Sequence, residues 1–164
     1  MDFKIEKMCE EHINGIAALE KECFSQPWSE GSLREELHKD NSNFLVALNE
    51  NALVVGYIGF YFVLDEGYIT NVAVASKFRR CGIAQNLLKK IIAFAQSQRL
   101  SFISLEVRAS NSAAISLYEM FGFEKVGLRR NFYTLPQENA VIMTKTKQSL
   151  LLKTDPKDKT CQKE

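Results

Sequence analysis

The sequence predicts a single α/β domain in which a mixed sheet carries helices on both faces. Its 164 residues suit one domain with one main core. Strand-like apolar runs alternate with segments of helical periodicity along the chain. One succession, strand 68–74, helix 82–97 and strand 101–107, forms a βαβ unit, whose two strands are parallel neighbours.

The first half of the chain predicts four strands and two helices. Residues 3–8 alternate apolar and polar side chains, as a half-buried strand does. Ser29 can cap the second helix, and Asn49, Glu50 and Asn51 suit a hairpin turn. The predicted elements are a strand at 3–8, helices at about 11–23 and 29–39, and strands at 43–48, 53–64 and 68–74.

The second half predicts two helices and three strands. After the βαβ unit, Ser110 or Asn111 can cap a helix that Gly122 closes as a C′ glycine. Strands are expected at 123–133 and 140–146. We therefore predict a domain at 1–146 and a charged, disordered tail at 147–164, with an extra terminal helix as the weaker alternative.

Composition and charge exclude several classes of protein. The net charge of +1 gives no electrostatic argument for a nucleic-acid or membrane partner. The four cysteines form no metal-ligand spacing, and we interpret His12 and His38 as solvated surface residues, so no metal is expected. The N-terminus lacks a signal-peptide core, and no apolar run approaches the ~18 residues of a membrane helix. We expect a cytoplasmic protein, with the oligomeric state open and a monomer preferred.

The turn between strand 68–74 and helix 82–97 is a candidate anion site. It brings Arg79, Arg80 and Gly82 to the start of a helix, where free N–H groups and the helix dipole favour negative charge. A phosphate would fit. The alternative is an ordinary strand-to-helix turn that binds nothing, because such turns commonly contain polar residues and a glycine.

Two further residues could carry chemistry. Glu106 interrupts an apolar strand near its C-terminal end, where ligands bind in open α/β sheets. It could instead simply pair with Arg108 or a backbone amide. Tyr118 follows Asn111 by two helical turns, so both share one face of the helix after Glu106. A helical tyrosine is, however, more often a core residue.

Together these stretches resemble a known family. The turn Arg79-Arg80-Cys81-Gly82-Ile83-Ala84 fits the Arg/Gln-x-x-Gly-x-Gly/Ala signature of the GNAT acyltransferases. More narrowly, residues 5–143 resemble the bacterial ribosomal-protein-alanine N-acetyltransferases, the RimI family. The motifs that carry this likeness are Glu22-Cys23-Phe24, Pro27-Trp28, Asn71-Val72-Ala73-Val74, Leu105-Glu106-Val107-Arg108, Ser110-Asn111, Ala114-Ile115, Leu117-Tyr118-Glu119, Gly122-Phe123 and Arg129-Arg130-Asn131-Phe132-Tyr133.

The resemblance implies a fold, a donor and an acceptor. The fold would be a GNAT-like, mixed but mostly antiparallel sheet of about seven strands with a central parallel pair. Acetyl-CoA would be the donor, and the N-terminal alanine amine of ribosomal protein S18 would attack it directly. Close relatives often have Tyr where this chain has Phe132, so a hydrogen bond expected there is lost.

The resemblance also implies roles for individual residues. Glu106 would be the general base, directly or through water, and Tyr118 the general acid. Phe24, Trp28, Asn131 and Tyr133 would border the peptide groove, and Asp65 or Glu66 would attract the amine. Taken by itself, Trp28 is more simply interpreted as a core residue that anchors its loop, a core plug. The donor would be held by Val72, Ala73 and Val74 along its pantetheine arm, by Arg79, Arg80, Cys81, Gly82, Ile83, Ala84 and Gln85 around its pyrophosphate, and by Asn111 and Tyr118.

Two other functions remain open from the sequence. One is an acetyltransferase for a small amine or a lysine side chain, because acceptor loops set specificity while the donor site is generic. The other is a CoA-sensing module without turnover, against which the presence of both Glu106 and Tyr118 argues. A nucleophilic role for Cys81 is disfavoured, because it lies at a variable position of the signature.

Overall fold

A seven-stranded mixed sheet forms the centre of the molecule, as the sequence predicts. The computed structural model describes residues 2–151. Every neighbouring pair of strands is antiparallel except β4 and β5, which are parallel. In sheet order the strands are β1 (Phe3–Lys7), β2 (Leu45–Asn49), β3 (Val54–Val63), β4 (Glu66–Val74), β5 (Phe102–Arg108), β7 (Gln137–Thr146) and β6 (Glu124–Thr134).

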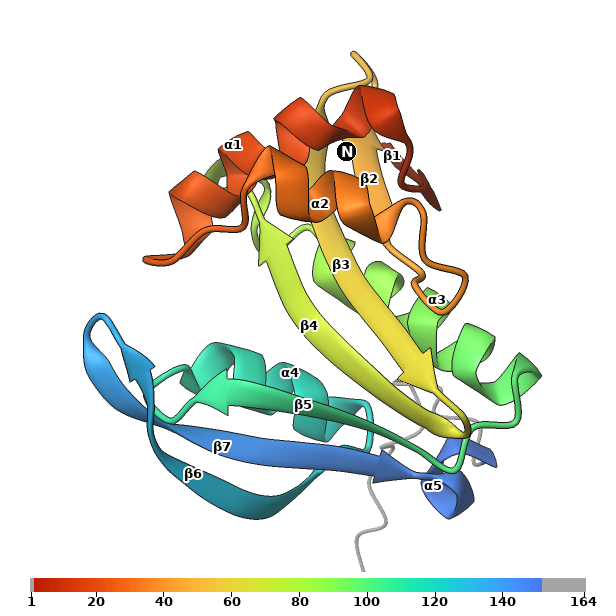
Figure 1. The fold of residues 1–164 in the computed structure, drawn as a ribbon, viewed down its shortest axis with the longest axis vertical. Helices are drawn as coiled ribbons and strands as arrows, with labels where there is room; N and C mark the ends of the chain where they lie inside the picture. The colour runs from red at the N-terminus through yellow and green to blue at the C-terminus, as the bar shows by residue number, and fades with distance from the viewer. Residues whose placement is uncertain (1, 152–164) are drawn as a thin grey trace, which may run out of the picture.

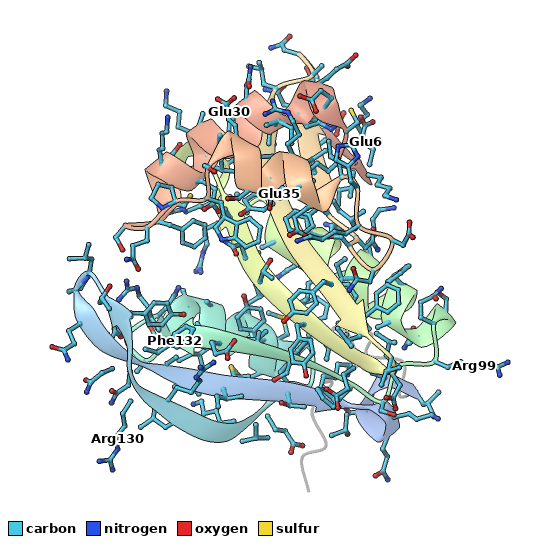
Figure 2. All side chains as sticks on the ribbon, viewed as in Figure 1. Glu6, Glu30, Glu35, Arg99, Arg130 and Phe132 are labelled. Atoms are coloured by element: carbon cyan, nitrogen blue, oxygen red, sulfur yellow. The ribbon has the colours of Figure 1, made fainter. Side chains whose placement is uncertain are left out.

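Helices cover both faces of this sheet, and each face has its own core (Figure 1). One face carries α1 (Ile13–Cys23), which follows the short helix η1 (Glu10–His12), and α2 (Glu30–Glu36). The other face carries α3 (Ile83–Ser97), which follows η2 (Ser76–Phe78), and α4 (Ser112–Met120). The apolar stripe of α3 is buried, and full burial of a Leu or Ile side chain stabilises the fold by about 1.5–3 kcal/mol; its residues are Ile83, Leu87, Leu88, Ile91, Ile92 and Ala95. Labelled charged residues such as Glu30, Arg99 and Arg130 point outward (Figure 2).

The predicted helix caps are present. Ser29 Oγ accepts the backbone N–H of Ser32 at 3.1 Å, at the start of α2. Asn111 Oδ1 accepts the backbone N–H of Ala114 at 3.1 Å, at the start of α4. Gly122 follows α4 with φ of 78°, the left-handed conformation that a C′ glycine adopts without a Cβ clash.

The parallel pair separates along its length, and this separation positions the site. β4 pairs with β5 only from Glu66↔Phe102 to Tyr68↔Ser104. Beyond Tyr68 the two strands diverge, so the sheet opens into a V between them (Figure 1). The C-terminal halves of both strands therefore leave backbone groups on their facing edges without a partner strand.

The structure corrects the domain boundary. Lys147–Leu151 forms a short helix, α5, and Leu150 is only 1% exposed in the core under α3. Lys145 Nζ donates to the carbonyl of Ser149 at 2.7 Å, which ties α5 to β7. The folded domain thus extends beyond residue 146, as the weaker alternative had it. The rest of the predicted tail lies outside the described residues.

His12 is buried, contrary to the surface position that its polar neighbours suggested. It is 6% exposed, and its Nδ1 accepts the backbone N–H of Cys9 at 3.1 Å. Its Nε2 lies 3.3 Å from Glu6 Oε1 of β1. The histidine side chain closes the N-terminus of η1, a tertiary role that the local pattern does not reveal.

Residues 2–151 contain neither a cluster of metal ligands nor a membrane-spanning helix. No three His, Cys, Asp or Glu side chains gather in this range in a way that could hold a metal ion. None of its helices combines the length and apolar character needed to cross a membrane.

Candidate active site

The turn from β4 to α3 has the backbone conformation of an anion cradle. Arg80 and Gly82 both adopt left-handed conformations, with φ of 63° and 79°. Gly82 is the N-cap of α3, a helix of 15 residues, and its carbonyl accepts Asn86 Nδ2 at 2.9 Å. Consecutive N–H groups of such a turn converge on one point at the positive end of the helix dipole. The turn can therefore bind a phosphate.

The end of β4 directs backbone groups toward the opening between β4 and β5. The Ala75 N–H points toward β3 and donates to the Val55 carbonyl at 2.9 Å. The carbonyl of the preceding residue, Val74, points away from β3 and accepts Arg79 Nε at 3.2 Å. Because successive residues of a strand point their backbone groups to opposite sides, Val72 and Val74 both face away from β3. They face the opening between β4 and β5, where an extended ligand can form strand-like hydrogen bonds.

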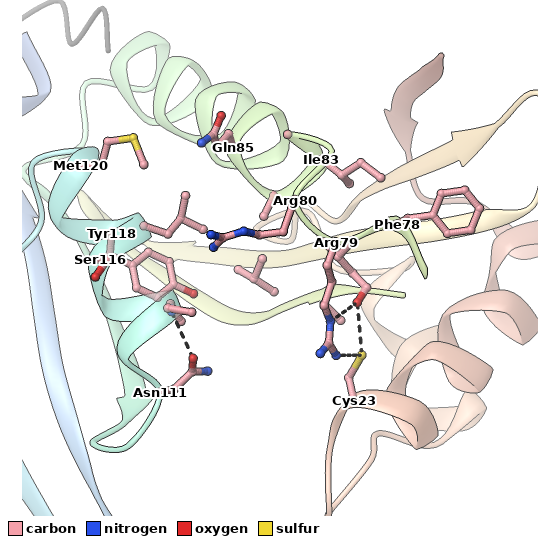
Figure 3. A pocket seen from close by; sticks show the side chains of 18 of the residues that line it. Cys23, Phe78, Arg79, Arg80, Ile83, Gln85, Asn111, Ser116, Tyr118 and Met120 are labelled. Carbon is pink, nitrogen blue, oxygen red and sulfur yellow. Dashed lines mark hydrogen bonds between the residues drawn. The ribbon is translucent and has the colours of Figure 1, made fainter. Parts of the chain in front are cut away.

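A pocket of about 1020 Å³ fills this opening. It brings together most of the residues predicted to hold the donor. The exception is Cys81, which is exposed outside the pocket, with its Sγ 3.6 Å from the Arg79 carbonyl. Cys23 and Phe24, at the end of α1, form part of the wall on the α1 side (Figure 3). The predicted residues that line it are Val72, Ala73, Val74, Arg79, Arg80, Gly82, Ile83, Ala84, Gln85, Asn111 and Tyr118.

Tyr118 reaches from α4 into the pocket (Figure 3). Its ring packs 5.7 Å from Phe123 and is almost fully buried, while its hydroxyl has no hydrogen-bond partner in the part of the chain that is described. Burial, with a smaller contribution from Tyr133, raises the pKa of Tyr118 above its ordinary value. The phenol therefore remains protonated at neutral pH and can donate a proton.

Glu106 lies on the face of β5 opposite the buried Leu105 and Val107, and it does not line the pocket. Its Oε1 accepts Arg129 Nη1 at 2.7 Å, and the guanidinium of Arg129 also stacks on Phe132 at 4.5 Å. Within residues 2–151, Oε2 has no hydrogen-bond partner. The ion pair is thus made with β6, neither with Arg108 nor with an amide, and one carboxylate oxygen remains available to a ligand.

Tyr133 and Asn131 lie on the same hairpin as Arg129. The Tyr133 hydroxyl donates to the Glu106 carbonyl at 3.4 Å, which brings it to the edge of the site. Asn131 has a left-handed φ of 54°, and its N–H donates to Asn139 Oδ1 at 2.9 Å. The first contact places Tyr133 beside Glu106, whereas the second holds Asn131 against Asn139 of β7.

Trp28 packs as a core residue. Its ring lies 5.9 Å from Phe44 in the core under α1 and α2. It does not line the large pocket. The core-plug interpretation of Trp28 therefore accounts for its contacts.

Asp65 and Glu66, expected to attract the amine, do not line the pocket. Both residues stand where β4 begins, whereas the pocket lies where β4 ends, at Val72 and Val74. Asp65 accepts the Ser101 hydroxyl, and Glu66 Oε2 accepts the Tyr68 hydroxyl at 2.6 Å. A strand of nine residues separates its two ends by about 3.3 Å per residue, so neither carboxylate reaches the pocket.

Sequence reasoning missed Glu20 as a buried structural centre between α1 and the sheet. Its carboxylate is completely buried and accepts hydrogen bonds from the Trp28 N–H at 2.7 Å, Asn71 Nδ2 at 3.0 Å and the Tyr57 hydroxyl. It thereby joins α1, the α1–α2 loop, β3 and β4. The available signal was a carboxylate on the apolar face of α1, in helical spacing with Ile13 and Ile16.

Glu20→Ala is expected to destabilise the protein by about 2–4 kcal/mol, because the buried Tyr57 hydroxyl and two part-buried N–H donors lose their acceptor. Urea unfolding measures the change. Glu10→Ala, which removes an exposed carboxylate paired with Arg34, is the matched control and should change stability far less. Equal effects from the two variants would contradict the role given to Glu20.

Comparisons with known proteins agree with this geometry. The Acetyltransferase (GNAT) family profile matches residues 13–123. The ribosomal protein bS18-alanine N-acetyltransferase of Haemophilus ducreyi is 34% identical over 143 residues, covering 85% of this chain and 97% of that protein. The crystal structure of the ribosomal-protein-S18-alanine N-acetyltransferase from Escherichia coli superposes with a TM-score of 0.80 at 29% identity, covering 87% of this chain and 92% of that one.

A third similarity is to a complex that contains ligands. A chain of the NatC complex bound to Gag peptide and CoA superposes with a TM-score of 0.79 at 26% identity. The match covers 89% of this chain and 99% of that one. The two TM-scores show that the chain shares its overall fold with both solved structures.

Proposed function

The chain belongs to the GNAT family of acetyltransferases, and we propose that it transfers the acetyl group of acetyl-CoA to the N-terminal alanine amine of ribosomal protein S18. The observation that carries the proposal is the opening between β4 and β5, with a phosphate-binding turn at one end and Tyr118 in its wall. The acceptor is inferred from relatives that bear this name at 34–35% identity. Because that acceptor is a ribosomal protein, we place the reaction in the cytoplasm.

Acetyl-CoA suits the pocket as its donor. The outward-facing backbone groups of Val72 and Val74 match the amides of a pantetheine arm, which can pair with them as a strand would. The turn from Arg80 to Gln85, at the start of α3, provides N–H groups and positive charge for the pyrophosphate. Asn111 lines the opposite wall, on α4.

Glu106 is proposed as the general base. An α-amino group has an ordinary pKa of about 7.7–8.0, so much of it is protonated at neutral pH and cannot attack a thioester. The free Oε2 of Glu106 can remove that proton, directly or through one water. The ion pair with Arg129 supports this role, since it holds the carboxylate in one orientation through Oε1 alone.

Tyr118 is proposed as the general acid. When the amine attacks, the C–S bond breaks and the leaving thiolate requires a proton, which the buried phenol can supply. The negative charge that develops on the acetyl oxygen needs a donor, and a free backbone N–H at the end of β4 is suited to provide it. Direct transfer then requires no covalent enzyme intermediate.

The donor assignment predicts the effect of Arg80→Gln. Loss of the guanidinium should raise the Kd of CoA by about tenfold, the effect of one lost charge-assisted hydrogen bond to phosphate. Isothermal titration with CoA measures this. Lys90→Gln removes a positive charge from the exposed side of the same helix and should leave the Kd unchanged. An unchanged Kd in both variants would remove Arg80 from the donor site.

The acceptor assignment is tested with a panel of amines at saturating acetyl-CoA. The panel contains an S18 N-terminal peptide, the same peptide with a blocked N-terminus, a lysine peptide with a blocked N-terminus, and a polyamine. Mass spectrometry should find acetylation of the first alone. Acetylation of the lysine peptide or the polyamine, without the S18 peptide, would reassign the acceptor, and no transfer to any amine would favour a CoA-binding module.

A further inference from the structure

Arg108 hydrogen-bonds both to the α1–α2 loop and to the β6–β7 turn. These two segments are called here the walls of the acceptor side. Arg108 lies two residues after Glu106 on β5, so both side chains emerge on the same face of the sheet. Its Nη1 donates to the Pro136 carbonyl at 3.1 Å and to Glu138 Oε2 at 3.2 Å. Its Nη2 donates to the Leu135 carbonyl at 2.8 Å and to Ser25 Oγ at 3.4 Å.

These partners come from segments far apart in the chain. Ser25 belongs to the loop between α1 and α2, and Leu135 belongs to the turn between β6 and β7. The two also contact each other, because the Ser25 hydroxyl donates to the Leu135 carbonyl. Both connections lie at the open end of the V (Figure 1). Arg108 is therefore the point at which the two walls are tied together.

The same network extends to the donor side. Glu138 binds Arg108 through Oε2 and accepts the Ser110 N–H through Oε1 at 2.6 Å. Hydrogen bonds from Ser110, and to a smaller extent from Arg108, hold the pKa of the Glu138 carboxyl below its usual value, so this carboxyl remains ionised. Ser110 immediately precedes Asn111, which lines the donor pocket.

The geometry requires an arginine. The guanidinium divides its donors between two backbone carbonyls, a carboxylate and a hydroxyl, and stacks at 4.2 Å over the ring of Tyr133. A lysine has one compact ammonium group, which can neither reach these partners together nor stack in this way.

We propose that Arg108 is a positioning residue that fixes the α1–α2 loop against the β6–β7 turn, and so assembles the groove that holds the acceptor's chain beyond its first residue. This inference rests on the proposed function. A peptide must lie between both walls, whereas a small amine needs only Glu106 and the donor. Arg108 therefore governs the binding of peptides and not the chemistry of the amine.

The test compares two acceptors in Arg108→Lys: a hexapeptide with N-terminal alanine, and alaninamide. The KM for the peptide should rise by roughly tenfold, as expected when one or two charge-assisted hydrogen bonds are lost, while kcat stays within about twofold. The KM and kcat for alaninamide should stay within about twofold of the original. A purely structural defect would reduce both reactions together.

The matched control is Arg130→Lys, on the same hairpin. Arg130 points away from the site (Figure 2), and within residues 2–151 it makes no hydrogen bond or ion pair. Its substitution should change neither acceptor. Unchanged peptide KM in Arg108→Lys, or an equal loss of kcat for both acceptors, would overturn the inference.

Ser25→Ala provides a second variant should Arg108→Lys fold poorly, since it removes one link between the walls and leaves Glu138 untouched. It should raise the KM of the peptide alone by roughly threefold, because the hydrogen bond to the Leu135 carbonyl and the longer one from Arg108 Nη2 are both lost. No change in that KM would also overturn the inference. Absence of transfer to both acceptors in the original protein would instead contradict the proposed function.

Discussion

Tyr118→Phe is expected to lower kcat by roughly 10²- to 10⁴-fold, the usual contribution of a positioned general acid. The change removes only the hydroxyl and keeps the ring, which packs against Phe123. Since the hydroxyl has no hydrogen-bond partner within residues 2–151, its loss should barely change the thermal stability. The Kd of CoA should also stay within about twofold, because the phenol acts on the leaving thiolate and not on ground-state binding.

The pH dependence of the original enzyme follows from the raised pKa of Tyr118. An acid works only while protonated, and a pKa above the ordinary value of about 10 keeps the phenol protonated throughout the neutral range. We therefore expect no loss of kcat from this group below about pH 10. Tyr61→Phe, a hydroxyl deletion outside the pocket, is the control. A Tyr118→Phe variant as fast as this control would exclude Tyr118 as the acid.

Local patterns predicted most of the fold, because each element forms from residues close in sequence. The alternation in β1 and the helical stripe of α3 follow from the geometry of one strand and one helix. The caps at Ser29, Asn111 and Gly122 satisfy backbone groups of their own helices. The donor turn was recognisable for the same reason, since Arg80 and Gly82 are neighbours in the chain.

Contacts between distant segments were not predictable in this way. The partner of Glu106 proved to be Arg129, which reaches it only because β7 brings β6 alongside β5. Glu20 and His12 looked like surface groups or ordinary helix positions until tertiary contacts buried them. The resemblance placed Asp65 or Glu66 near the amine, and strand direction puts both at the end of β4 that lies away from the pocket.

Such contacts also explain why donor and acceptor sites differ in predictability. The donor site is built from one continuous segment, β4 through α3, together with α4. The acceptor side combines the α1–α2 loop with the paired β5 and β6–β7 hairpin, and the loop contacts them through Ser25, which hydrogen-bonds to Arg108 and Leu135. Specificity therefore depends on the relative placement of loops, which no single motif encodes.

Glu106→Gln is expected to lower kcat/KM for a peptide by roughly 10²- to 10⁴-fold at neutral pH, the range for loss of a general base. The amide is isosteric, and Arg129 is half exposed, so the broken ion pair should cost little stability. CoA affinity should not change, because Glu106 lies outside the donor pocket. Glu124→Gln, at the start of β6, is the matched surface control.

The pH dependence of this variant distinguishes a base from a merely structural carboxylate. Without Glu106, only the fraction of acceptor that is already unprotonated can attack, and this fraction rises with pH up to the amine pKa of about 7.7–8.0. The deficit relative to the original enzyme should therefore be largest at acidic pH and should narrow as the pH passes that value. A deficit that stays constant from pH 6 to pH 9 would show that Glu106 orients the site without removing the proton. The transfer of that proton would then have to be assigned to a water held by another group.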